Sequence, residues 1–117
     1  MADAALFMGW NEPKVGREAH AMELWASTMT FWTRQLEAGN VESFEPVILA
    51  RHGGTLNGFI LIRGTTENLD RIRRSDEYND LIMQVTYCLE GFGTVDAYIG
   101  DQLKDRMSRY SKLAGKG

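Results

Sequence analysis

Residues 58–64 read Gly-Phe-Ile-Leu-Ile-Arg-Gly, and no other segment constrains the architecture of this chain as strongly. A short apolar run bounded by glycines is typical of a buried β-strand. Successive side chains of a strand point to opposite faces of the sheet, so Phe59 and Leu61 share one face and the two isoleucines share the other. The sequence therefore predicts a strand that is apolar on both faces, and both faces need a cover.

Two other stretches repeat this two-sided pattern. Residues 5–10 are apolar throughout and end at a turn sequence that contains Pro13. Residues 44–51 are rich in strand formers and lead through a glycine-rich turn into the strand described above, so we expect a hairpin. Proline cannot donate a hydrogen bond to a neighbouring strand, so Pro46 predicts an edge strand or a bulge.

The fourth expected strand, residues 94–99, alternates between polar and apolar side chains instead. We expect its apolar set to face the helices, namely Val95, Ala97 and Ile99. Thr94, Asp96 and Tyr98 would then lie on the other face. A partly buried Asp96 would need a partner there, for which Arg63 is one candidate. A structural ion pair is one interpretation of Asp96, and a catalytic acid is the other.

Residues 16–38 change to a helical period. Apolar residues at steps of three and four share one helix face, and here they are Met22, Trp25, Met29, Trp32 and Leu36. We expect this stripe to lie in the core and Gly39-Asn40 to end the helix. Leu24 and Phe31 lie on the opposite side, where they are expected to be isolated exposed residues or a further oligomer contact.

The apolar positions of residues 65–90 do not keep a single helical phase, and the break falls at Ser75. Serine is a good N-cap, and the arginines before it suit the end of a helix. We therefore expect a short helix, a kink, and a second helix over about 76–90. A final short helix is expected over 101–112, and residues 114–117 are expected to fray.

The order strand, helix, hairpin, helix, strand predicts an α+β protein of ferredoxin-like βαββαβ topology. Residues 1–117 are expected to form a single domain with its core over about 4–112, in which a four-stranded antiparallel sheet carries both long helices on one face. The other face of this sheet is also apolar. We expect a second copy to cover it, sheet against sheet; in the alternative, the final helix folds back over it.

This element order, the two-sided strands and the kinked region around Arg73-Arg74-Ser75-Asp76-Glu77-Tyr78 resemble the dimeric α/β-barrel superfamily. In that superfamily two ferredoxin-like subunits close their sheets into a barrel. The resemblance implies a ligand pocket between sheet and helices, and functions that range from cofactor-free monooxygenases and isomerases to regulatory ligand-binding domains. Its haem-degrading members combine an early-strand Asn, a Trp and a helical His. This chain has Asn11 beside Trp10 but no His in residues 65–90, so we expect neither haem nor another cofactor.

Composition excludes further classes of protein. Thirteen Lys and Arg against sixteen Asp and Glu give a net charge of -3, which argues against nucleic acid or an anionic membrane as a partner. Cys88 is the only cysteine, so we expect a buried, inert thiol, no internal disulfide and no metal site. Neither a signal-peptide pattern nor an apolar stretch of about 20 residues occurs, and a soluble cytoplasmic protein is expected.

Few side chains in the sequence are candidates for catalysis or ligand binding. The expected catalytic residues are Asn11, which would hydrogen-bond a substrate, and His52, which would accept a proton at the mouth of the barrel. Both also have a structural interpretation as turn residues. The expected ligand-binding residues are Trp10, Trp25, Trp32 and Tyr98, although the helical tryptophans also fit simple core packing. His20 is expected at the surface.

Two functions follow for the expected homodimer. In the first, it is a cofactor-independent monooxygenase or isomerase that acts on an aromatic or polyketide-like compound. In the second, it is a non-catalytic ligand-binding or regulatory module of the same fold. Either would take a small apolar or aromatic ligand, and no motif in the chain identifies a reaction.

Overall fold

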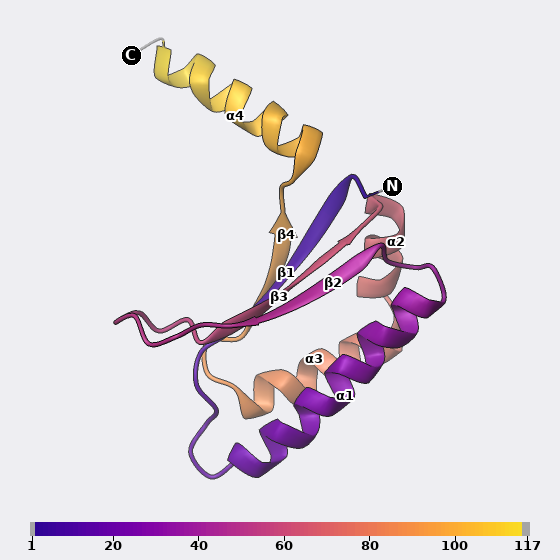
Figure 1. Cartoon of the computed structure of the whole chain (residues 1–117), viewed down its shortest axis with the longest axis vertical. Coiled ribbons are helices and arrows are strands. Elements are labelled where there is room, and N and C mark those ends of the chain that lie inside the picture. Colours follow the sequence, from indigo (N-terminus) through magenta and orange to yellow (C-terminus); the bar gives the residue numbers. More distant parts are fainter. Residues whose placement is uncertain (1, 116–117) are drawn as a thin grey trace.

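Four antiparallel strands in the order β2-β3-β1-β4 form the sheet of this protein, which a computed structural model describes over residues 2–115. The elements along the chain are β1 (Ala4–Trp10), α1 (Glu18–Glu37), β2 (Ser43–Ile48), β3 (Gly58–Gly64), α2 (Thr66–Arg73), α3 (Asp76–Cys88), β4 (Gly93–Ala97) and α4 (Gly100–Gly115). Helices α1 and α3 lie on one side of the sheet (Figure 1). This confirms the predicted α+β, ferredoxin-like arrangement.

The strands keep close to their predicted positions. β3 has the predicted bounds, and β2 pairs with β3 alone, so Pro46 sits on an edge strand as expected. β2 ends at Ile48 rather than at residue 51, because the chain leaves the ladder for the hairpin loop. The helix-facing side of the two central strands is buried: Leu6, Met8, Ile60 and Ile62 are at most 1% exposed.

The buried face of α1 differs from the predicted stripe. Leu24 and Phe31 are buried, whereas Met22 and Leu36 are 69% and 40% exposed, so neither Leu24 nor Phe31 is free to form an oligomer contact. Counting 100° per residue, the buried face is rotated by roughly 80° from the prediction. The reason is that α1 packs on α3 as well as on the sheet: the rings of Phe31 and Tyr78 lie 6.1 Å apart between the two helices.

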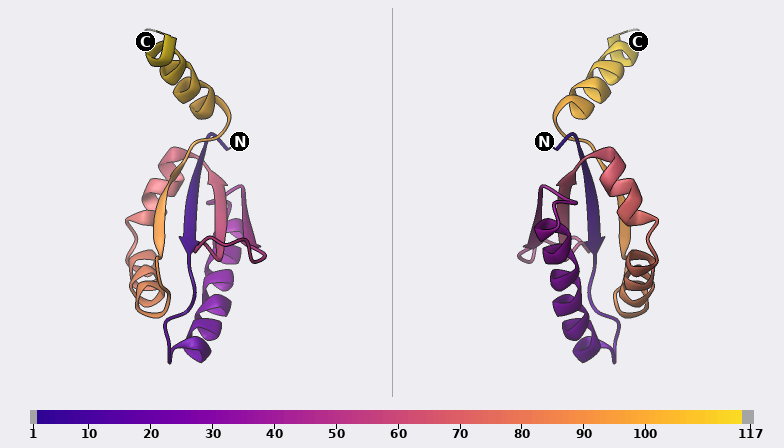
Figure 2. Two further views of the ribbon diagram at one scale, coloured as in Figure 1. Left: turned by 90° about the vertical axis from the view of Figure 1, so that its left-hand side faces the viewer. Right: turned by 90° about the vertical axis from the view of Figure 1, so that its right-hand side faces the viewer.

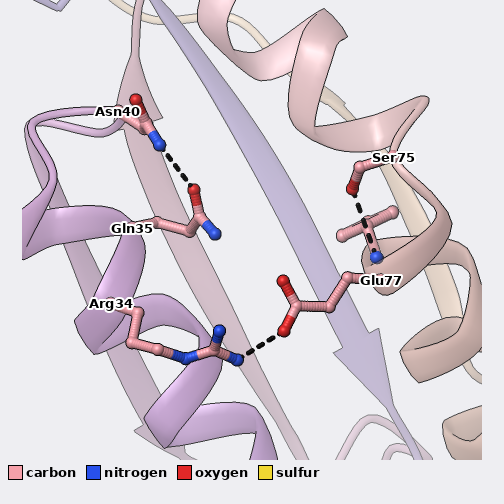
Figure 3. Close-up of polar contacts among 6 residues, drawn as sticks. Arg34, Gln35, Asn40, Ser75 and Glu77 are labelled. Carbon is pink, nitrogen blue, oxygen red and sulfur yellow. Dashed lines mark hydrogen bonds and ion pairs between the residues drawn. The ribbon is translucent and has the colours of Figure 1, made fainter.

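The break in the second helical region is confirmed. Thr65 caps α2 by accepting a hydrogen bond from the Asn68 backbone N–H, and Ser75 caps α3 by accepting one from Tyr78 (Figure 3). The Ser75 hydroxyl also donates to the Ile72 carbonyl at 2.7 Å, which ties the end of α2 to the start of α3. Two separately capped helices therefore replace one continuous helix.

The expected orientation of β4 is wrong. Register places Asp96 opposite Leu6 and Val95 opposite Phe7, so Thr94 and Asp96 share the helix-facing side. There the Thr94 hydroxyl hydrogen-bonds the Tyr78 hydroxyl at 3.0 Å, and Asp96 accepts from Arg73 at 2.7 Å rather than from Arg63. An edge strand can place polar side chains inward because the α2–α3 junction supplies partners for them.

The second face of the sheet, here called the open face, is consequently more apolar than predicted. It carries Val47, Phe59, Leu61, Phe7 and Val95, with Glu45 and Arg63 toward one end. In the left view of Figure 2 no helix among residues 2–115 crosses in front of these strands. The alternative in which the final helix folds back over this face is therefore wrong.

Helix α4 is longer than predicted and extends from the end of β4 away from the rest of the structure (Figure 1). None of its residues is buried. Ala114 and Gly115, expected to fray, belong to this helix, and Lys116 and Gly117 lie outside the described residues. Among residues 2–115 no helix combines the length and the apolar character needed to cross a membrane.

Candidate functional site

A cavity of about 380 Å³ lies between the sheet and helices α1 and α3. Its lining comes from β1, β2, β3, α1, α3 and the loops beside them: Met8, Trp10, Pro13, Ala21, Met22, Leu24, Trp25, Thr28, Ile48, Asn57, Ile60, Val85, Leu89 and Phe92. The volume is within the range of about 300–1,000 Å³ that small-molecule sites occupy. Apart from Thr28 and Asn57, the residues of this lining are aromatic, methionine or aliphatic.

Trp10 and Trp25 form the aromatic part of the lining. Trp10 ends β1 on the helix-facing side, and its ring meets that of Trp25 on α1 edge to face, with centroids 5.8 Å apart. Gly58 makes this position possible, because a Cβ atom there would come within 2.9 Å of the Trp10 ring and 2.8 Å of the Val47 carbonyl oxygen. The glycine that begins β3 thus makes room for the indole.

Met22 and Ile48 mark the rim of the cavity. They are 69% and 61% exposed although both contribute to the lining, so the cavity opens to solvent between α1 and the end of β2. Methionine is flexible and its sulfur makes favourable contacts with aromatic rings. A flat apolar molecule can therefore enter beside Met22 and rest on the two indoles.

Within residues 2–115, Thr28 and Asn57 bring a hydroxyl and an amide side chain to the lining. The buried Thr28 hydroxyl donates to the Leu24 carbonyl at 2.8 Å, so its proton is used within α1 and its oxygen is left to accept. The Asn57 backbone is held on both sides, because its N–H donates to the Trp10 carbonyl and its carbonyl accepts from Leu49. These two residues can orient a ligand through one or two hydrogen bonds.

No side chain that lines the cavity is titratable, among the residues that the structure describes. General acid–base catalysis needs an ionisable group within hydrogen-bonding reach of the reacting atoms. The lining can hold and orient an apolar molecule, but it has no group of this kind with which to move a proton.

The two expected catalytic residues do not line the cavity. His52 is exposed in the hairpin loop between β2 and β3, where one ring nitrogen contacts the Leu56 carbonyl and the other accepts from the Gly54 N–H. Asn11 follows β1, donates its backbone N–H to the Glu90 carbonyl at 2.8 Å, and packs its side chain on Gly91. Both residues stabilise turns in this structure, and their catalytic role stays a prediction.

The expected ligand-binding residues divide equally between lining and non-lining positions. Trp10 and Trp25 line the cavity, whereas Trp32 and Tyr98 do not. Trp32 is completely buried, and its ring packs on those of Phe31 and Tyr78. Tyr98 is 41% exposed beside the start of α4, with the Arg106 guanidinium 4.0 Å from its ring centroid. Cavity residues such as Asn57 and Phe92 were not foreseen.

The remaining titratable residues are dispersed. His20 is exposed near Glu23, as expected, and Cys88 is fully buried. Over residues 2–115 no group of three or more His, Cys, Asp and Glu side chains is placed to hold a metal ion. The apolar cavity is accordingly the candidate site with the strongest physical support.

Comparison with known proteins identifies the fold. The structure is similar to the crystal structure of a dimeric protein of unknown function and ferredoxin-like fold from Bacteroides fragilis, with a TM-score of 0.53 and 12% sequence identity. The match covers 83% of this chain and 97% of that one. No model of a known protein family matches the chain, and no curated protein matches its sequence. The protein therefore belongs to the class with a ferredoxin-like fold.

Proposed function

We propose that this protein is a homodimeric module that binds an uncharged, aromatic small molecule in the cavity between sheet and helices and releases it unchanged. The observation that carries the proposal is a lining that, over residues 2–115, has no titratable group and consists of aromatic, methionine and aliphatic side chains except at Thr28 and Asn57. Burying an apolar ligand against such a surface provides the affinity, at about 25 cal/mol per Å². Thr28 and Asn57 would select the orientation of the ligand.

The open face supports the homodimer. Phe7 and Phe59 stack on this face with ring centroids 5.3 Å apart, and Val95 beside them is 56% exposed. An apolar layer of this kind gains stability when a second copy covers it, sheet against sheet. The B. fragilis protein of the same fold is dimeric. On the same face the Arg63 guanidinium lies 3.7 Å from the Glu45 carboxylate, and this ion pair would then form part of the polar rim.

The binding proposal is tested by filling the cavity. Ala21 lines it, whereas Ala26 on the same helix is exposed and does not. We expect 2-naphthol to bind the unmodified protein saturably, with a change in tryptophan fluorescence from Trp10 and Trp25. Ala21→Phe should weaken this binding by about 10-fold or more because it occupies the space of the ligand, and Ala26→Phe should change it by less than about twofold. Equal binding by both variants would place the ligand elsewhere.

Catalysis is tested by product analysis of the same complex. Our proposal predicts that chromatography and mass spectrometry recover the aromatic ligand unchanged after incubation in air. The enzyme interpretation predicts instead that the ligand is converted, and that Asn11→Ala and His52→Ala abolish the conversion. Turnover that is lost in both variants would replace the binding proposal with an enzymatic one.

A further inference from the structure

Helix α4 carries an apolar stripe that no other element of residues 2–115 covers. Leu103, Met107 and Tyr110 follow one another at steps of four and three and lie within about 60° of one another around the helix. They are 47%, 57% and 68% exposed. On the opposite side Arg109 donates to Asp105 at 2.9 Å, so that side is polar and suited to water. The helix is amphipathic, and its apolar side has no partner within residues 2–115.

A helix of this length is not stable by itself. Isolated helices of about 15 residues are marginal in water even when their sequences favour helix strongly. The 16 residues of α4 include no buried side chain that could hold them to the body of the subunit. Its stability therefore depends on whatever surface receives the stripe of Leu103, Met107 and Tyr110.

The start of α4 directs the helix away from its own sheet. The Leu103 N–H donates to the Ile99 carbonyl, and the Arg106 guanidinium stacks on the Tyr98 ring, which fixes the first turn against the end of β4. In Figure 1 the helix rises beyond the sheet and leans toward the side opposite α1 and α3. That is the side on which the open face lies, where the proposed second copy would stand.

The distribution of charge along the chain also favours a second copy as the partner of α4. Residues 1–99 carry eight Lys and Arg against fourteen Asp and Glu, a net charge of −6, and residues 100–117 carry five against two, a net charge of +3. A basic segment attached to an acidic body is attracted to the acidic body of another copy. An anionic membrane would attract the helix but repel the rest of the chain, so it is the less favoured partner.

We propose that α4 is an exchanged clasp: in the homodimer each α4 reaches across and packs Leu103, Met107 and Tyr110 on the body, residues 2–99, of the second copy. The inference rests on the proposed homodimer and adds to it the element that fastens the two subunits together. Sheet contact and clasp are separate parts of the interface, so they can be removed separately.

Hydrogen exchange and sedimentation test the clasp together. For the full chain, amide protection over α4 should be present at protein concentrations well above the dimer dissociation constant and should disappear well below it. Replacing the stripe, by Leu103→Gln, Met107→Gln and Tyr110→Gln in one variant, should raise the dissociation constant by about 100-fold, because three apolar side chains lose their burial. Ser108→Gln with Ser111→Gln is the matched control outside the stripe, and it should leave the constant within about twofold.

The alternative results separate the clasp from the homodimer. An unmodified chain that sediments as a monomer at all concentrations overturns both proposals. A stripe variant that dimerises as tightly as the unmodified chain overturns the clasp and leaves the homodimer standing. Protection of α4 that does not depend on concentration would mean that the helix docks on its own subunit. Protection that appears only with phosphatidylglycerol vesicles would assign the stripe to a membrane, and either result overturns the clasp.

Discussion

The two faces of the sheet use nearly the same residue types for different purposes. On β3, Ile62 points toward the helices and is completely buried, whereas its neighbour Leu61 points to the open face and remains half-buried in the single subunit. On β1, Leu6 and Phe7 show the same contrast. Hydrophobic character alone therefore does not tell whether a residue stabilises the folded subunit or a contact between subunits. The helix-facing layer stabilises the subunit, and the open face is available for assembly.

The largest expected effect comes from the matched pair on β3. Ile62→Ala should lower the free energy of unfolding by about 2–4 kcal/mol, because it leaves a cavity in a packed layer, and should hardly change the dimer dissociation constant. Leu61→Ala should lower the unfolding free energy of the monomer by less than about 1 kcal/mol and raise the dissociation constant by about 10-fold. Urea unfolding at low and high protein concentration, with sedimentation velocity, measures both quantities. Similar effects of the two variants would remove the distinction between the faces.

An effect of intermediate size on the free energy of unfolding is expected from Tyr78, at the edge of the helix-facing layer. Burial raises the pKa of the Tyr78 phenol above its ordinary value of 10.0, although the Thr94 hydrogen bond and the Arg73 charge oppose the shift. The folded state thus holds this proton more tightly than the unfolded chain. The resulting stability is complete below about pH 10 and is lost as the pH rises through the raised pKa.

Tyr78→Phe tests this dependence. The variant should lose about 1 kcal/mol at pH 7, because Thr94 loses its hydrogen-bond partner, and its stability should fall less steeply than that of the unmodified protein above pH 10. Urea unfolding at pH 7 and at several values above pH 10 gives the comparison. Tyr87→Phe, which removes an exposed phenol on the same helix, should keep the steep decline. Parallel pH curves for the protein and Tyr78→Phe would show that another group controls the alkaline loss.

The smallest effect on the free energy of unfolding is expected from an exposed ion pair between helices α1 and α3. Arg34 on α1 and Glu77 on α3 form an ion pair at 2.5 Å, with side chains 54% and 52% exposed (Figure 3). Water and salt screen such pairs, so Arg34→Met should cost less than about 1 kcal/mol, and the difference should vanish in 1 M NaCl. Arg51→Met, in the hairpin loop, serves as the control for loss of one positive charge. A cost above about 2 kcal/mol that persists in salt would mean that the aliphatic part of Arg34 packs the helix pair.

Local sequence patterns were sufficient to predict most of the fold. The glycines around 58–64 bounded β3, Pro46 placed β2 at an edge, and Ser75 divided the second helical region. It was harder to predict which side of each helix or strand faces the core. The rotation of α1 and the orientation of β4 both depend on polar or aromatic partners that lie far away in the sequence, such as Tyr78 for Phe31 and for Thr94. Hydrophobic periodicity carries no information about such partners, and it therefore misassigned these two elements.

The candidate site was predicted only in part for a related reason. Trp10 and Trp25 could be found because aromatic residues are natural lining residues of a pocket. His52 and Asn11 were selected for the chemistry their side chains can perform, but each stabilises a turn. Asn57 gave no signal in the sequence, because an asparagine in a loop before a strand is common; it reaches the cavity through its backbone pairing with Trp10.

The central place of β1 in the sheet has a consequence for how the protein is made. Residues 4–10 are synthesised well before one of their neighbours in the sheet, residues 93–97. Until β4 leaves the ribosome, β1 has one edge without a strand beside it, and unpaired edges attract strands of other chains. Contacts between such distant segments also slow folding. The nascent chain is therefore at greater risk of aggregation, and has a greater need of a chaperone, until β4 has left the ribosome.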